Sequence, residues 1–254
     1  MRGRPAALRQ VTRAAAVLLA PNPGPMTLEG TNTWILRAPG EAGCIVVDPG
    51  PLHEGHLQAI VECGPVEVVL LTHGHSDHSA GAGRLAELTG AAVRALDPRH
   101  RHGSEGLQGG DLVVGGGLEL RVLATPGHTS DSLSFVLPDT VLTGDTVLGR
   151  GSTVVAHPDG VLRDYLAALR ALEGLGDAMV LPGHGPELAH AGQAAQSYLA
   201  HRGQRLAQVQ AALAAGAQSA QQVMEVVYAD LDRALWPAAM LSVLAQLAYL
   251  REDA

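Results

Sequence analysis

Residues 66–78 read VEVVLLTHGHSDH, an apolar run that ends in three histidines and one aspartate. The apolar, Val-rich run over 66–71 predicts a buried strand, and the polar residues after it form the loop that leaves the strand. That loop carries His73, His75, Asp77 and His78. Imidazole and carboxylate groups packed into one short loop converge on a small volume, and they are donors that zinc and similar cations prefer. The stretch therefore predicts a metal site at the exit of a strand.

The same pattern, a strand followed by a metal-ligand residue beside a glycine, recurs three more times along the chain. The predicted strands run into Pro126-Gly127-His128, Gly144-Asp145 and Pro182-Gly183-His184. Donors from distant parts of the chain are thereby expected to meet at one edge of a sheet, where a preorganised site is built. Seven donors exceed what one four-coordinate ion uses. Their number indicates two metal ions that share one carboxylate, with a water completing each shell.

The composition weighs against a nucleic-acid binder. The chain has 254 residues and a formal charge of -8, its 17 basic residues are all Arg, and it has one Phe, two Trp and four Tyr. A non-specific nucleic-acid binder carries the opposite charge, and so few aromatic rings leave little surface for base stacking. The apolar stretch 14–20 predicts a first strand, and no run approaches the roughly 20 apolar residues of a membrane span. We therefore expect a cytoplasmic protein without a membrane partner.

The chain divides by pattern into a mixed part and an all-helical part. Short apolar runs between Gly, Pro and Asp predict strands at 33–36, 43–48, 66–72, 92–95, 118–125, 133–137, 140–143 and 178–181. Helical periodicity appears over 80–88 and 162–172. We expect a catalytic domain over residues 1–190 and a helical region over residues 191–254. In the second region we predict a long helix to Gly216, a helix capped by Ser219 and a third helix from about Pro237. This region is expected to pack on the domain or to form a homodimer contact.

The motif THGHSDH, followed in order by GHT, TGD and PGHG, resembles the metallo-β-lactamase superfamily over nearly all of residues 20–185. The resemblance implies an α+β protein, a four-layer αββα sandwich with a small all-helical C-terminal appendage and the site at the sheet edges. It implies one metal held by His73, His75 and His128, a second held by Asp77, His78 and His184, and Asp145 as the bridge. It also implies that Asp48 does not bind the metal itself but fixes the orientation of a metal-ligand residue. The alternative is an ordinary aspartate in a turn.

The resemblance further implies a zinc-dependent hydrolase with two Zn²⁺ ions, manganese and iron being the alternatives. A bridging hydroxide would attack an ester, thioester or related bond, with Asp77 and Asp145 as the candidate catalytic residues. Glyoxalase II shares all seven ligands, but its glutathione-binding residues include lysines, which this chain lacks. True β-lactamases usually have Cys in place of Asp145, so antibiotic hydrolysis is not favoured. A mono-iron persulfide dioxygenase, which oxidises its substrate, stays open as an alternative.

Residues 22–34, residues 149–155 and the pair His201-Arg202 resemble a narrower group, that of β-lactamase-like protein 2. This group includes an endonuclease of single-stranded RNA and has a winged-helix-like C-terminal region. The present chain stops at 251–254, about where a wing begins, so that region is expected to be truncated. RNA is a less favoured partner than an anionic small molecule, although two divalent ions would attract either. Candidate contacts to an anionic group are Arg150, Ser152 and Thr153, the alternative being an ordinary Gly-rich loop.

The other histidines lack the spacing of metal ligands, and we expect structural roles for them. Among them are His53, His56, His157, His190 and His201.

Overall fold

Two β-sheets form the centre of the molecule, which a computed structural model describes for residues 7–252. The first sheet has the order β1 (Arg9–Gln10), β2 (Ala15–Leu19), β3 (Asn32–Leu36), β4 (Cys44–Val47), β5 (Val66–Leu70) and β6 (Ala92–Arg94). The second has the order β11 (Met179–Pro182), β10 (Thr140–Gly144), β9 (Leu133–Val136), β8 (Leu118–Ala124) and β7 (Leu112–Gly115).

The strand directions bring the predicted donors to one edge. β4, β5 and β6 run parallel, and so do β10 and β11. β8 and β10 are both antiparallel to β9, so they too run in one direction. The strands that precede the donor residues of the second sheet, β8, β10 and β11, therefore end on the same side of that sheet. Carboxyl ends of parallel strands are where open α/β sheets bind ligands.

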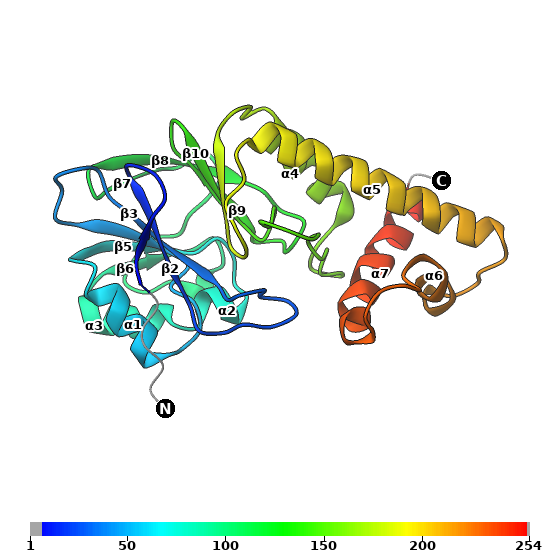
Figure 1. The fold of residues 1–254 in the computed structure, drawn as a ribbon, viewed down its shortest axis with the longest axis horizontal. Helices are drawn as coiled ribbons and strands as arrows, with labels where there is room; N and C mark the ends of the chain where they lie inside the picture. The colour runs from blue at the N-terminus through cyan, green and yellow to red at the C-terminus, as the bar shows by residue number, and fades with distance from the viewer. Residues whose placement is uncertain (1–6, 253–254) are drawn as a thin grey trace.

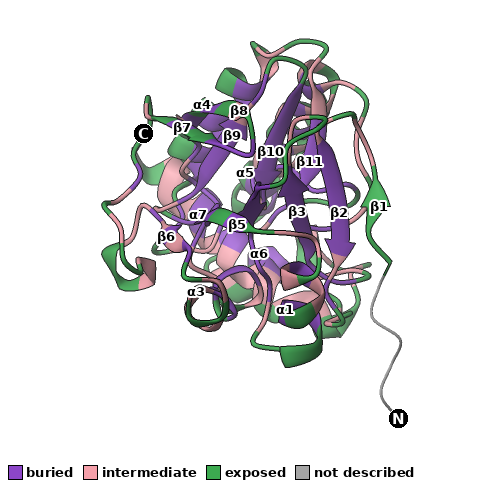
Figure 2. Cartoon of the chain, turned by 90° about the vertical axis from the view of Figure 1, so that its left-hand side faces the viewer, coloured by how far each residue is buried: buried purple, intermediate pink, exposed green. Residues whose placement is uncertain are grey.

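Helices cover the outer faces of both sheets and complete a four-layer αββα sandwich (Figure 1). Between the sheets, Trp34 and Val47 of the first share one buried core with Phe135 and Leu142 of the second. Helices α1 (Glu54–Val61) and α3 (Ala82–Thr89) bury their apolar side chains on the other face of the first sheet. Helices α4 (Leu162–Glu173) and α5 (Ala191–Ala214) do the same on the second. Most central strands are buried, whereas β1 is exposed and β7 is exposed at alternate positions (Figure 2). The predicted fold class is confirmed.

The C-terminal region is helical, as predicted. Helix α5 extends beyond the sheets and packs its far half against α6 (Ala220–Val227) and α7 (Trp236–Glu252). Ser219 caps α6, with its hydroxyl accepting a hydrogen bond from the backbone N–H of Gln222 at 3.2 Å. Of the stretch 251–254, where we expect the wing to begin, the last two residues lie outside the described part. Among the described helices, none combines the length and apolar character needed to cross a membrane.

Some elements differ from the sequence prediction. The structure adds β1, β7 and α1, and the loop after β5 contains a one-turn helix, α2 (Ser76–Ser79). α1 escapes prediction because its cap is His53, whose Nδ1 accepts from the N–H of His56, a role usually taken by Ser, Thr, Asp or Asn. The predicted strands are otherwise present within one or two residues of their expected ends.

Candidate metal centre

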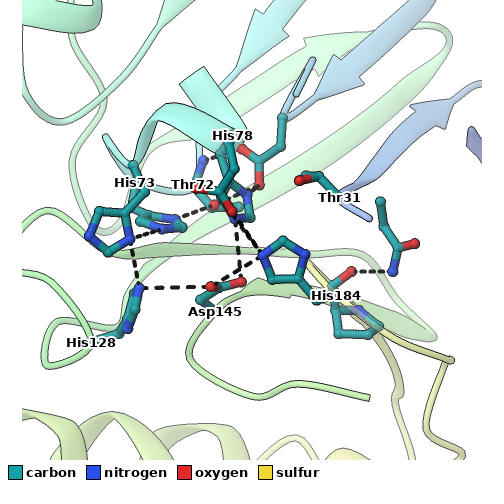
Figure 3. Close-up of polar contacts among 12 residues, drawn as sticks. Thr31, Thr72, His73, His78, His128, Asp145 and His184 are labelled. Carbon is teal, nitrogen blue, oxygen red and sulfur yellow. Dashed lines mark hydrogen bonds and ion pairs between the residues drawn. The ribbon is translucent and has the colours of Figure 1, made fainter. Parts of the chain in front are cut away.

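All seven predicted donor residues lie together at the strand ends. His73 and His75 follow β5, while Asp77 and His78 lie on α2. The other three follow three strands of the second sheet: His128 comes after β8, Asp145 after β10 and His184 after β11. In Figure 3 the rings of His73, His78, His128 and His184 point toward one another and toward the carboxylate of Asp145.

The carboxylate of Asp48 fixes the ring orientation of two of these histidines. It accepts hydrogen bonds from Nδ1 of His78 at 2.8 Å and from the hydroxyl of Thr72 at 2.7 Å. Because the Thr72 hydroxyl donates to Asp48, it accepts from Nδ1 of His73, which lies 3.0 Å away. Both rings therefore use Nδ1 as a donor and offer Nε2 to the centre. Asp48, 1% exposed, itself adopts a φ of 53° at the end of β4.

Main-chain carbonyls fix two further rings in the same way. Nδ1 of His128 lies 2.7 Å from the carbonyl oxygen of Val154, and Nδ1 of His184 lies 3.1 Å from that of Gly30. A carbonyl only accepts, so Nδ1 carries the hydrogen in both rings and Nε2 faces the centre. Such partners behind a ring orient metal-ligating histidines and select their tautomer.

The donor atoms are too close to satisfy one another. Nε2 of His73 and Nε2 of His128 each lie 3.0 Å from Nδ1 of His75, which can donate a hydrogen to only one of them. Oδ1 of Asp145 is buried without a hydrogen-bond partner. A buried acceptor left unpaired is costly, and a cation would satisfy these atoms together. The donor set, imidazole nitrogen with carboxylate oxygen, is that of zinc and related ions.

The donors form three overlapping groups, each with its ligand atoms within 4.8 Å of one another. The first is His73, His75 and His128, the second is Asp77, His78 and His184, and the third is His73, His78 and Asp145. The third group joins the other two, so Asp145 lies between them. This arrangement is consistent with a metal site.

The two carboxylates demand positive charge in this buried place. Burial opposes ionisation of Asp145, but the neighbouring rings of His78 and His184, whose Nε2 atoms lie 3.4 and 3.5 Å from its oxygens, outweigh it and hold its pKa well below the ordinary value. Asp77 behaves alike: burial opposes ionisation, and hydrogen bonds from the same two rings depress its pKa. In turn, burial disfavours the charged form of His184, yet Asp145 and Asp77 raise its pKa to about 9. A metal cation would displace such protons, because a ligand imidazole binds in its neutral form.

Two rings of the first group stay neutral. Burial lowers the pKa of His73 well below its usual value, and the neighbouring charge of His78 adds to the effect. Burial also lowers the pKa of His128, although Asp145 opposes the shift. Both rings are therefore ready to act as ligands at neutral pH.

The centre also requires the glycine that precedes His184. A Cβ atom on Gly183 would lie 2.6 Å from Oδ1 of Asp145 and 2.7 Å from Cε1 of His78. Nearby, the side-chain amide of Asn32 donates to the carbonyls of Pro182 and Gly185 and ties this loop to β3. Figure 3 shows Thr31, at the start of β3, beside His184.

A cleft of about 310 Å³ opens from the centre toward the helical region. His128 and Asp145 lie at its inner end, and its walls include Met26 and Leu28 from the β2–β3 connection. The loop after β10 and the C-terminal helices complete the lining, with most of the surface apolar. The helical residues in the lining are His201, Arg202, Arg205, Tyr228, Leu231, Leu235, Ala238, Ala239 and Ser242.

The predicted substrate contacts all lie on this cleft, but two of them have partners within the chain. Arg150 forms an ion pair with Glu29 at 2.5 Å, in which both side chains are half-exposed. Thr153 is buried, and its hydroxyl donates to the main-chain carbonyl of Asp145 at 2.8 Å. Ser152 is exposed. Contact of these residues with a substrate stays a prediction.

Several lining residues escape reasoning from ligand spacing. His201, for which a structural role is expected, lies on the cleft, as does Arg205 one turn further along α5. Leu231 and Leu235 come from the segment that connects α6 to α7. The subgroup resemblance could have pointed to these lining residues. It covers residues 22–34, 149–155 and 201–202, and all three stretches contribute to the lining.

Comparisons with known proteins show which family the chain is similar to. A family model described as the metallo-beta-lactamase superfamily matches residues 26–184, and one described as the beta-lactamase associated winged helix domain matches residues 219–253. A beta-lactamase-like protein 2 homolog from Caenorhabditis elegans is 29% identical, over 97% of this chain and 87% of its own. An atrochrysone carboxyl ACP thioesterase from Aspergillus fumigatus is 34% identical, over 77% of this chain and 64% of its own.

Solved structures are also similar. The crystal structure of a metallo-beta-lactamase family protein from Thermus thermophilus is 26% identical, with a TM-score of 0.80 over 94% of each chain. A second protein, solved in a di-iron-bound form, is 26% identical, with a TM-score of 0.56 over 68% of this chain and 94% of its own.

Proposed function

This chain belongs to the metallo-beta-lactamase superfamily, and we propose that it is a dinuclear metal hydrolase that cleaves a thioester or related ester of an anionic small molecule. The observation that carries the proposal is the apolar cleft whose inner end is formed by His128 and Asp145. A substrate that lies in this cleft would have its scissile carbonyl beside the donor cluster.

The donors divide naturally between two ions. His73, His75 and His128 would hold one ion, Asp77, His78 and His184 the other, and Asp145 would bridge them. Zinc suits these ligands, and iron or manganese also accepts them. When bound, two divalent ions lower the pKa of a water from about 15.7 toward 7 and polarise the oxygen of the bond to be cleaved.

Asp77 is the residue that we propose to move protons. Its Oδ2 is 3.1 Å from Nε2 of His184 and 3.4 Å from Nε2 of His78, and its side chain is 27% exposed. A carboxylate in this place can orient the attacking water and accept its proton. As the water oxygen bonds to the carbonyl carbon, the carbon–sulfur or carbon–oxygen bond breaks, and the leaving thiol or alcohol takes up the proton.

The lining supports an acyl substrate. Leu28, Leu148 and Leu231 give the walls an apolar character that suits a hydrocarbon or ring. Arg205 adds a basic group from the helical region, which suits a carboxylate or phosphate elsewhere in the substrate. The fungal relative named as a thioesterase supports a carbonyl substrate.

A second candidate function is cleavage of single-stranded RNA. The observation in its favour is the positive charge of the cleft: Arg150, Arg202 and Arg205 belong to its lining, and within the described lining Asp145 is the sole acidic side chain. The scarcity of aromatic rings opposes it, since Tyr228 is the one Phe, Tyr or Trp side chain in that lining.

The test is a substrate panel on the zinc-loaded full chain, with Asp145→Asn as the matched inactive variant. Acyl thioesters, aryl esters, lactones, a phosphodiester and single-stranded RNA would be compared at equal enzyme concentration. We expect thioester or ester hydrolysis by the wild type, and a loss of at least about a hundredfold in the variant, because one bridging donor is removed. RNA cleavage without ester hydrolysis would replace the first function by the second. No hydrolysis of any class by the zinc-loaded chain, together with oxygen consumption on a persulfide by the iron-loaded chain, would contradict both.

A further inference from the structure

The segment Thr153–Val155 lies between the donor cluster and the C-terminal helices and makes polar contacts to both. Thr153 is 2% exposed and Val155 is 1% exposed. A buried segment outside helices and strands must find partners for its main-chain groups elsewhere. Here these partners connect two parts of the molecule that are far apart in the sequence.

On its inner side the segment holds two donor residues. The hydroxyl of Thr153 donates to the carbonyl of Asp145 at 2.8 Å, which fixes the main chain beneath that carboxylate. The carbonyl of Val154 accepts from Nδ1 of His128 at 2.7 Å, which fixes the ring. The orientation of both donors therefore depends on where this segment lies.

On its outer side the segment is held by α5 and α7. Nη2 of Arg202 donates to the carbonyl of Thr153, and the N–H of Val155 donates to the hydroxyl of Ser242 at 3.4 Å. Arg202 is 2% exposed, and its guanidinium carbon lies 4.9 Å from the centre of the Tyr165 ring. Within residues 7–252 it has no acidic partner, and its Nε has no hydrogen-bond partner.

A buried guanidinium without a counter-ion is an expensive way to anchor a helix. An apolar side chain would pack α5 at lower cost. The guanidinium supplies a donor that reaches the carbonyl of Thr153 and, through this residue, the main chain of Asp145. We propose that Arg202 is a positioning residue through which the C-terminal helices hold His128 and Asp145 in place for metal binding.

The C-terminal helices are expected to influence the binding of the two metal ions unequally. His78 and His184 are held by Asp48 and by the carbonyl of Gly30, which belong to the first sheet and its connections. No described contact joins these two holding groups to the helical region. The inference rests on the dinuclear centre proposed above, and it predicts that the helices stabilise the ion at His73, His75 and His128 more than the other ion.

The test is a stepwise titration of the metal-free full chain with Co²⁺, followed by its ligand-field absorption. The wild type is expected to take up two equivalents. Arg202→Met, which keeps an unbranched apolar stem but has no donor, should bind one equivalent about 10- to 100-fold more weakly, as is usual when a group behind a ligand is lost. The other equivalent should be weakened less, because it shares only Asp145 with the affected site. Removing a positive charge would by itself strengthen cation binding, so weaker binding reports lost positioning.

Val209→Ala is the matched control. Val209 is fully buried on α5 two turns beyond Arg202 and packs only within the helical region. This variant should unfold more easily but bind both equivalents as the wild type does. Should Arg202→Met not fold, Ser242→Ala removes the weaker contact and should weaken the same equivalent to a smaller extent.

The outcomes separate the two proposals. A wild type with two equivalents and an Arg202→Met titration like that of Val209→Ala would overturn the role of Arg202 alone, and so would an equal loss at both equivalents. A wild type that binds fewer than two equivalents would contradict the dinuclear centre itself.

Discussion

Single residues at the back of the centre determine which atoms face the metal. Asp48 receives hydrogen bonds from Thr72 and His78, and Thr72 in turn receives one from His73. This chain of hydrogen bonds leaves Nε2 of both rings as the ligand atom. Asp48 carries the cost of a left-handed backbone conformation at φ 53°, and backbone strain of this kind persists where the surrounding contacts hold it.

Gly183 gives the sharpest prediction at the level of one residue. In Gly183→Ala the new Cβ must displace Oδ1 of Asp145 or the ring of His78, because both lie closer than 3.0 Å. We expect metal binding at least about tenfold weaker, with turnover falling in step. Gly203→Ala is the control, since a Cβ there meets nothing within 4 Å. It should raise stability by about 1 kcal/mol, as Ala does in a helix, and leave metal content unchanged. Equal metal content in both variants would contradict the crowding at Gly183.

The metal-donor residues can be predicted from the sequence, but the groups that hydrogen-bond to their rings and orient them cannot. His128 and His184 stand out because they follow apolar runs and adjoin glycines. The carbonyl groups of Val154 and Gly30 orient these rings, yet every residue has a carbonyl, so residue type carries no signal of that role. The contact of Arg202 with the carbonyl of Thr153, next to Val154, likewise emerges only from the three-dimensional structure.

Individual elements are predicted best where pattern and burial agree. β5 is a continuous apolar run except for Glu67, and α3 ends at Gly90, whose φ of 73° suits glycine. β7 escapes prediction because Leu112 and Val114 face solvent and only the alternate positions are buried, on an edge strand bounded by glycines. Such a strand forms because it pairs with the neighbouring strand β8, and its own sequence pattern is weak.

The link between α1 and the first sheet gives a prediction on pH. Nε2 of His56 donates to the hydroxyl of Thr33, which donates to the carbonyl of Asp48, the atoms being 2.9 and 2.7 Å apart. Burial, with a smaller effect of the His53 charge, lowers the pKa of His56 to about 4. The neutral form is therefore favoured by folding. Its stabilisation is complete above pH 6.5 and is lost as the pH falls from 6.5 to about 4, by about 3 kcal/mol at most.

His56→Gln keeps a donor for Thr33 but removes this titration. Denaturant unfolding at a series of pH values should show a shallower loss of stability in the variant than in the wild type over the same acidic range. His102 is exposed and gives a control, His102→Gln, which should follow the wild type because this side chain makes no described hydrogen bond. Parallel pH curves for His56→Gln and the wild type would contradict the buried neutral state of His56.

At the scale of the whole molecule, the helical region and the sandwich form one cleft. Met26 and Leu28 come from the first sheet's connection, Arg150 from the loop after β10, and Tyr228 and Leu235 from the helical region. The sequence predicts both regions as separate patterns. It does not predict the cleft, because a cleft arises from packing between distant segments and no single segment encodes it.

The central claim is that catalysis depends on a metal pair held by this cluster. Metal content and hydrolysis of the best substrate should be measured on one sample during stepwise removal of zinc by a chelator and its return. We predict about two zinc ions per chain at the start, turnover that falls below about 1% once both are removed, and recovery when zinc is restored. Undiminished turnover of the metal-free chain would contradict the claim.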